Sequence, residues 1–139
     1  MKLQILRPEQ EPIEGYKTVI VDKGNLNLSE LSDNECDTIL APEVMDSFPI
    51  DSVGELINGI VSKLRKGGEV VIGGTDIRVF AKMVGNGSMD PQAASNVVAN
   101  VASMTTVDLA KGLLTSLGLD IASSTIDGIH YEIKATRGR

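Results

Sequence analysis

The 139-residue sequence has one cysteine, Cys36, one histidine, His130, and no tryptophan. A single cysteine excludes a disulfide bond within the chain, so we expect a reducing compartment, the cytoplasm, as the location. One cysteine and one histidine are too few for a zinc site of the usual nitrogen and sulfur type. The sequence therefore predicts no metal site.

The sequence also lacks an excess of basic residues and a long apolar run. Lysine and arginine together number 13, against 19 acidic residues, and the formal net charge is −6 at pH 7. Nucleic acids and anionic membrane surfaces both attract basic patches, so neither is an expected partner. No apolar run reaches the roughly 20 residues of a membrane helix. The N-terminus, MKLQILRPEQEP, has too short an apolar stretch for a signal peptide.

The sequence does contain short apolar runs separated by turn residues. Its length suggests one domain, residues 1–139. Such runs predict strands at 3–6, 18–21, 38–41, 69–73, 119–124 and 129–136. Asp127-Gly128 marks a tight hairpin turn between the last two. Residues 69–73 show no polar alternation, as expected for a strand buried on both faces.

Residues 52–66 carry their apolar side chains on one helical stripe. Ser52 and Glu55 have the spacing of a capping box at its start, and Gly67 is expected to take the left-handed cap at its end. A second glycine pair, Gly73-Gly74, follows the strand that comes next. These glycines lie where open α/β sheets bind ligands, although without a following Lys-Ser/Thr they are a weak phosphate-binding signal.

The remaining helices are predicted in the second half of the chain. Asp76 can cap a helix through Val84, Thr105 opens a helix that Gly118 closes, and residues 91–104 have a helical composition rich in small residues. Strands that alternate with helices indicate an α/β fold. We expect a mainly parallel sheet with helices on both faces and a C-terminal antiparallel hairpin.

Four stretches resemble motifs of one enzyme family. GYKTVIVD resembles a second strand with its terminal acid, and LSDNECDTILAPEVMDSFP the segment around a fourth strand. LRKGGEVVIGGTD resembles the signature that leads into a fifth strand, and TTVDLAKGLLTSLGLDIASSTIDGIHYEIKATR a closing helix and hairpin. Together these stretches resemble class I S-adenosylmethionine-dependent methyltransferases, especially the short kind often found near glycan-synthesis genes. The resemblance implies a Rossmann-like methyltransferase fold.

The resemblance also implies a cofactor site. Asp22 takes the position of the acid that binds the ribose hydroxyls, Asn34 and Asp37 that of an adenine-side turn, and Asp76 that of an acid in the cleft. Arg7 could pair with the carboxylate of the cofactor.

From the residues alone, other roles stay open for these and neighbouring positions. Asp22 and Asp37 are also explained as turn residues and Asp76 as a helix cap. Glu43 and Asp46 could point into the cleft, but a solvated helix face is the favoured expectation for both. His130, with no nucleophile motif near it, is expected to be a surface or edge histidine.

The stretch LQILRPEQEPIEG departs from the family at its glycine-rich first loop. It has no glycine before Gly15, Pro8 and Pro12 remove two backbone donors, and three glutamates add negative charge. The 11 residues between the first two strands are about the minimum for a crossover helix with its turns, and they include two prolines, so we expect at most one helical turn there and no full crossover helix. Where relatives often have Glu-His-Phe, this sequence has Asp46-Ser47-Phe48.

These departures favour a degenerate methyltransferase-like domain that binds S-adenosylmethionine weakly or not at all and acts as a binding or scaffolding subunit. The alternative is an active methyltransferase of unknown acceptor that holds the cofactor through Asp22 and the Asn34–Asp37 turn. Residues 88–104 have a small apolar face. We expect this segment to contact a second copy of the chain or another protein, or to cover the cleft.

Overall fold

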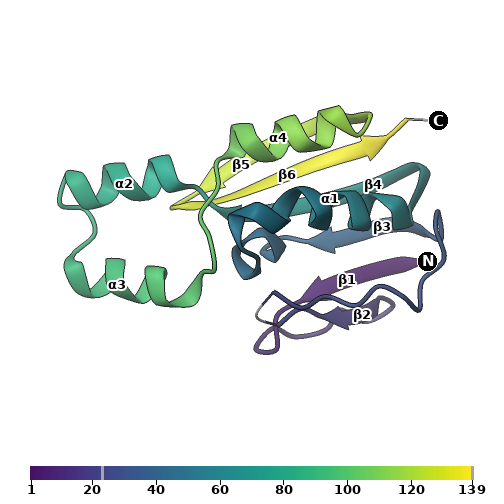
Figure 1. Ribbon diagram of the computed structural model, residues 1–139, viewed down its shortest axis with the longest axis horizontal. Coiled ribbons are helices and arrows are strands. Elements are labelled where there is room, and N and C mark those ends of the chain that lie inside the picture. The colour runs from purple at the N-terminus through teal and green to yellow at the C-terminus, as the bar shows by residue number, and fades with distance from the viewer. Residues whose placement is uncertain (23, 139) are drawn as a thin grey trace.

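The computed structural model describes residues 1–22 and 24–138 (Figure 1). Its strands are β1 (Lys2–Leu6), β2 (Lys17–Ile20), β3 (Cys36–Ala41), β4 (Leu64–Thr75), β5 (Leu119–Asp127) and β6 (His130–Arg137). Its helices are α1 (Val53–Lys63), α2 (Ile77–Gly85), α3 (Pro91–Asn100) and α4 (Val107–Ser116). Two short 3₁₀ turns, η1 (Val44–Ser47) and η2 (Ile50–Ser52), precede α1. None of the described helices is long and apolar enough to cross a membrane.

The described strands form one six-stranded sheet in the order β2-β1-β3-β4-β6-β5. β1 to β4 run parallel, while β6 runs antiparallel to both β4 and β5. Gly128, with a φ of 61°, lies in the turn between Asp127 and His130, which are paired across the hairpin. The predicted strands, their parallel pairing and the closing hairpin are confirmed.

The core lies on one face of this sheet. Buried side chains of α1, α4 and the central strands form a single cluster, which includes Ile57, Ile60, Leu114, Ile39, Val70, Ile72 and Ile133. Figure 1 shows α1 and α4 side by side over this face.

The opposite face carries polar side chains, such as the exposed Glu132 and the ion pair between Lys134 Nζ and Glu69 Oε1 at 3.7 Å. We expected helices on both faces. Among the described residues, α1 and α4 share one face, and α2 and α3 extend beyond the strand ends. The β1–β2 connection, which could have carried a helix on the other face, forms turns.

That connection, residues 7–16, packs against β1 in place of a helix. Gln4 is only 9% exposed, its Oε1 accepts the N–H of Ile13 at 2.8 Å, and its Nε2 donates to the carbonyl of Glu11 at 3.3 Å. One buried amide thus satisfies two backbone groups of the connection. The prediction that a full crossover helix does not fit between β1 and β2 is confirmed.

The bounds of α1 differ from those predicted. The side chain of Ser52 makes no capping hydrogen bond, and the helix ends at Lys63 rather than residue 66. It ends there because Leu64 is fully buried and pairs with Cys36 in the sheet. Gly67 has the predicted positive φ, 80°, but it lies in a bulge of β4 and does not cap the helix.

The start of α4 differs from the prediction by one residue. Thr106 is the N-cap, and its hydroxyl accepts the N–H of Leu109 at 3.0 Å. Thr105, the predicted cap, is buried, and its hydroxyl lies 2.6 Å from that of Tyr131.

Candidate functional site

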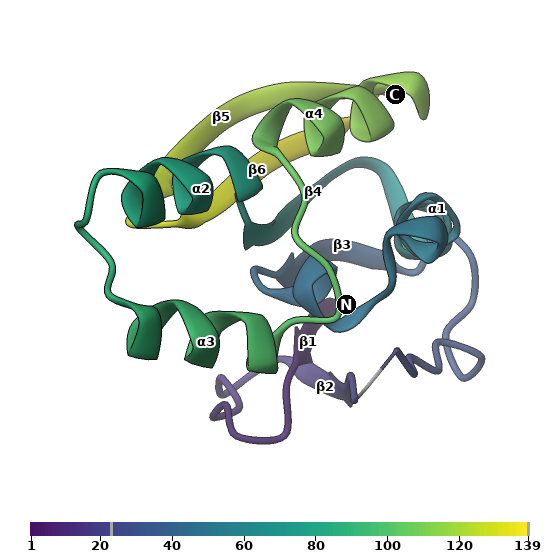
Figure 2. The same ribbon diagram turned by 60° about the vertical axis from the view of Figure 1, so that its left-hand side comes forward.

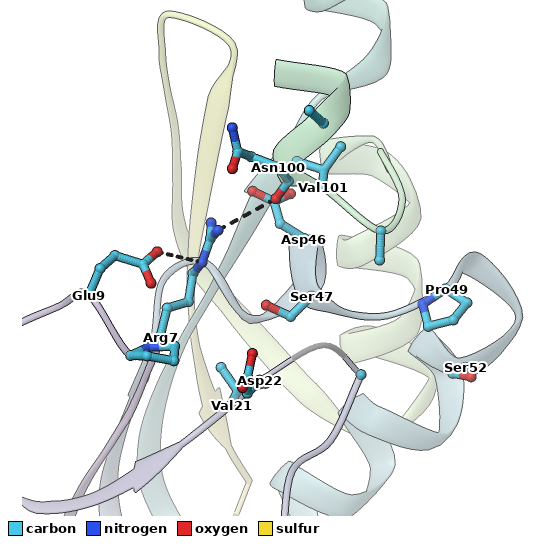
Figure 3. Close-up of a pocket in the computed structure, with 14 residues that line it drawn as sticks. Arg7, Glu9, Val21, Asp22, Asp46, Ser47, Pro49, Ser52, Asn100 and Val101 are labelled. Carbon is cyan, nitrogen blue, oxygen red and sulfur yellow. Dashed lines mark hydrogen bonds and ion pairs between the residues drawn. The ribbon is translucent and has the colours of Figure 1, made fainter. Parts of the chain in front are cut away.

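A cleft with a volume of about 600 Å³ opens at the carboxyl ends of β1, β2 and β3 (Figure 3). Its walls come from the residues that follow β1 and β2, from the turns η1 and η2, and from residues 99–102 at the end of α3. This is the place where open α/β sheets bind ligands. Two of the predicted site residues, Arg7 and Asp22, lie in its wall.

Arg7 follows β1 directly, and its guanidinium group is already engaged by acids of the same chain. Its Nε lies 2.9 Å from Glu9 Oε1, and its Nη1 lies 3.9 Å from Glu43 Oε2. Its Nη2 donates to the carbonyl of Asn100 at 3.5 Å, which links the end of β1 to the end of α3 (Figure 3). Arg7 is therefore compensated within the chain.

Asp22 follows β2 and has two roles in the structure. Its backbone exchanges two hydrogen bonds with that of Asn25, at 3.1 and 2.9 Å, so it closes a turn. Its side chain also lies in the cleft wall (Figure 3). Asp22 can therefore close a turn with its backbone and line the cleft with its side chain at the same time.

Asp46 is a third cleft residue, and here the expectation of a solvated helix face is wrong. It is 6% exposed, its Oδ1 accepts the N–H of Thr75 at 2.7 Å, and its Oδ2 accepts the Thr75 hydroxyl at 3.0 Å. Burial raises the pKa of Asp46, although both hydrogen bonds from Thr75 oppose the shift. Glu43, which was expected on the same solvated face, accepts a 3.0 Å hydrogen bond from Gln10 and lies beside Arg7.

The glycine pair at the end of β4 is what allows Asp46 to approach Thr75. A Cβ on Gly74 would lie 2.8 Å from Met45 Cβ and 3.3 Å from Asp46 Oδ1, and one on Gly73 would lie 2.5 Å from the carbonyl of Tyr131. Real Cβ atoms do not approach that closely, so only glycine lets η1 lie flat against β4. Gly73 and Gly74 are packing residues here, and neither has a positive φ.

Asn34 and Asp37 lie at the opposite end of the sheet from the cleft. Asn34 precedes β3 with a φ of 61°, and its Oδ1 accepts a 2.7 Å hydrogen bond from Arg137. Asp37 Oδ2 lies 3.6 Å from the amino group of Met1 and 3.8 Å from Arg65 Nη2. The structure therefore does not bring these two residues together with Arg7 and Asp22.

Asp76 is 1% exposed and caps two helices at once. Its Oδ1 accepts the N–H groups of Arg78 and Val79 at the start of α2, at 2.9 and 3.2 Å. Its Oδ2 accepts the N–H of Val107 at the start of α4, at 3.1 Å. The predicted cap is confirmed, and both carboxylate oxygens are occupied by backbone donors.

His130 lies on an interior strand rather than at a sheet edge, because β6 pairs with both β4 and β5. Its Nε2 lies 2.8 Å from the carbonyl of Pro42, and the side chain is partly buried. This contact gives the histidine a role in holding the Pro42 turn against the sheet.

No protein-family model matches the sequence, and no curated protein matches it. Solved structures do match. A SAM-dependent methyltransferase from Archaeoglobus fulgidus superposes with a TM-score of 0.63 at 15% identity, over 98% of this chain and 86% of that one. The fold is that of S-adenosylmethionine-dependent methyltransferases.

Two further matches to this methyltransferase fold are longer than the present chain. The PH0226 protein from Pyrococcus horikoshii superposes with a TM-score of 0.59 at 11% identity, over 88% of this chain and 60% of its own length. A complex between the Haloferax volcanii Trm112 methyltransferase activator and a methyltransferase gives a TM-score of 0.58 at 10% identity, over 93% and 64%.

Within this methyltransferase fold, the end of the predicted contact segment 88–104 lies in the cleft wall, at residues 99–102. The N–H of Ala102 donates to the carbonyl of Asp46 at 2.7 Å, and the hydroxyl of Ser103 donates to the carbonyl of Phe48 at 2.7 Å. These bonds fix the end of the segment to η1. Residues 99–102 of the segment therefore line the cleft, and whether the segment covers it or contacts a second copy stays a prediction.

Proposed function

We propose that this chain is a methyltransferase-like domain that has lost competent S-adenosylmethionine binding and acts as a binding or scaffolding subunit. The end of β1 supports this proposal more than any other feature. Residues 7–16 form turns where the fold's relatives are expected to present a glycine-rich loop and a helix N-terminus. A helix N-terminus offers a row of free N–H groups and a positive dipole end to an anionic ligand, and the described residues of this connection form no helix.

The charges around the cleft add to this argument. Among the described residues of the cleft wall, Glu9, Asp22 and Asp46 share one cation, Arg7, which is already paired with Glu9. A ligand carboxylate would have to displace Glu9 from Arg7 while it faces the remaining acids. The wall therefore disfavours the carboxylate end of the cofactor.

The expected loss of affinity follows from the missing donors. Two or three charge-assisted hydrogen bonds, each contributing about 1.5–3 kcal/mol, amount to roughly 3–9 kcal/mol. A micromolar site has only about 8 kcal/mol of binding free energy. We therefore expect a dissociation constant of about a millimolar or weaker for S-adenosylmethionine.

Titration calorimetry with S-adenosylmethionine and S-adenosylhomocysteine tests the proposal. Glu9→Gln, which frees Arg7, should tighten binding measurably, whereas Glu30→Gln, a remote glutamate with a side chain 85% exposed, should not. Micromolar binding to the unmodified chain would overturn the proposal, and an ordered ligand in a soaked crystal, with Arg7 on its carboxylate, would do the same.

The alternative, an active methyltransferase, is supported by one observation. Asp22 lies in the wall of a cleft of about 600 Å³, at the strand end where the family's ribose-binding acid is expected. Methyl transfer by direct displacement depends mainly on positioning of donor and acceptor, so it does not require a catalytic histidine. Micromolar cofactor binding in the titration would select this alternative.

A protein partner is supported by the structural neighbours. One of them is a methyltransferase in a complex with the activator Trm112. A domain of this fold can thus work within a protein assembly, which is the role we propose here.

A further inference from the structure

Residues 77–104 form a helical hairpin, the α2–α3 hairpin, that buries none of its residues. Both views show it extending away from the sheet, past the carboxyl ends of the parallel strands (Figures 1 and 2). It is held at its two ends, by the Asp76 cap and the Arg78–Asp108 ion pair on one side and by Ala102 on the other. Between these ends its side chains are exposed or half-buried, and none is fully buried.

The two helices are too short to depend on their own hydrogen bonds. α2 has 9 residues and α3 has 10, whereas an isolated helix in water is marginal below about 12–15 residues. Most helices of this length are stabilised by tertiary packing of an apolar face. The α2–α3 hairpin therefore needs a surface that covers it.

The side chains of the hairpin are suited to such a surface. The apolar residues of α2 cover more than half of the helix circumference, and the exposed fractions of Ile77 and Val84 are 46% and 42%. α3 has no charged residue, and the exposed fraction of Val98 is 57%. Half-buried Phe80 adds an aromatic ring to the same hairpin. Apolar residues exposed together in this way mark an interaction surface.

Charge and size indicate what covers it. The chain has a net charge of −6, yet residues 77–104 contain two basic residues, Arg78 and Lys82, and one acidic residue, Asp90. Two copies of an acidic chain repel each other least where the local charge is not negative. The segment also has the size of one side of a standard interface, which is roughly 20–30 residues.

We propose that the α2–α3 hairpin is the contact surface of a homodimer in which the hairpins of two copies pack against each other as a four-helix bundle. Such a contact is self-complementary, because the same patch serves on both copies, and twofold dimers are the commonest oligomers. Packing of antiparallel helix pairs around a shared apolar core is the geometry of four-helix bundles. The dimer does not depend on whether the cleft binds the cofactor.

Light scattering coupled to size-exclusion chromatography tests the proposal. The unmodified chain should have twice the mass of 14.8 kDa, and Val84→Arg and Val98→Arg should each return the mass to that of one chain. Because both side chains are exposed within one copy, these variants should keep the sheet with its packed helices α1 and α4, and any loss of helical circular dichroism should be confined to the residues of the α2–α3 hairpin.

Asn96→Arg is the matched control. It places the same charge on α3 two residues from Val98, which is about 200° around the helix, and it should leave the dimer mass unchanged. A monomer mass for the unmodified chain at high protein concentration would overturn the proposal and indicate that another protein covers the hairpin. A dimer mass retained in both valine variants would also overturn it, since the dimer contact would then lie elsewhere.

Discussion

Replacement of Asp76 by alanine should destabilise this protein more than any other single change to a helix cap. The carboxylate is 1% exposed and accepts three backbone N–H groups, two from the start of α2 and one from the start of α4. Alanine leaves all three donors without their acceptor, and little room exists for water to replace it. One side chain therefore caps the N-termini of both α2 and α4.

The size of the loss follows from these contacts. Loss of an N-cap costs about 0.5–2 kcal/mol, and a buried donor left without a partner costs about 1–3 kcal/mol. The two together amount to roughly 2–5 kcal/mol, a large fraction of the 5–15 kcal/mol that is typical for a domain. Asp76→Asn keeps one acceptor oxygen and places an amide group where the second oxygen was. The stability lost in this variant should therefore be smaller than that lost in Asp76→Ala.

Urea denaturation followed by circular dichroism measures the effect, at one fixed protein concentration because dimer formation would shift the transition. Asp90→Ala is the control, since Asp90 caps α3 through a single exposed bond to Ala93 at 2.8 Å and should cost less than about 1 kcal/mol. Equal losses for Asp76→Ala and Asp90→Ala would show that the shared cap contributes no more than an ordinary one.

Two further predictions concern the residues around the glycine pair. Gly73→Ala should lower the free energy of unfolding by at least about 1–3 kcal/mol, because the added methyl group meets the backbone of Pro42. Gly59→Ala on α1, where the added methyl group meets nothing within 4 Å, should raise it by up to about 1 kcal/mol. Thermal midpoints that shift in the same direction for the two variants would contradict this. Burial raises the pKa of Asp46, so the folded state binds its proton more tightly than the unfolded chain, and the free energy of unfolding should fall as pH rises above the ordinary aspartate pKa of about 4. Asp46→Asn keeps both contacts with Thr75 and should flatten that profile, and parallel profiles for the two proteins would refute the assignment.

The sheet could be predicted from the sequence because each strand has its own local pattern. Residues 70–72 are an uninterrupted apolar run, and the strand they predict lies in the interior of the sheet, between β3 and β6. Asp127-Gly128 has the chemistry of a two-residue hairpin, and the hairpin is present. The end of α1 was harder to predict, because Leu64 fits a helical stripe as well as it fits the strand pairing with Cys36 that determines its conformation.

The candidate site could be predicted only in part. Arg7 and Asp22 follow predicted strands, and parallel strands place their carboxyl ends at one edge of the sheet, so both lie in the cleft. Asn34 precedes β3 and Asp37 is its second residue, so the same rule places both at the other edge. The buried position of Asp46 was not predicted, because a single 3₁₀ turn has no sequence period. Gly74 was the sequence signal for it, since only glycine lets η1 approach β4 so closely there.

The connection after β1 packs against the sheet and contributes to the cleft wall, and the proposed loss of cofactor binding depends on its conformation. It is tied to the second face of β1 by the two hydrogen bonds of buried Gln4, and its first residue, Arg7, is tied to Glu9 and Glu43. Its path is therefore determined by packing as well as by its prolines. Glycine at positions 8 and 9 would restore backbone freedom and one donor, but the described connection would still contain no helix to direct a row of N–H groups into the cleft. Recovery of tight cofactor binding in a Pro8→Gly, Glu9→Gly variant would show that the loop sequence alone limits the site, whereas binding no tighter than that of Glu9→Gln is expected if the missing helix N-terminus limits it.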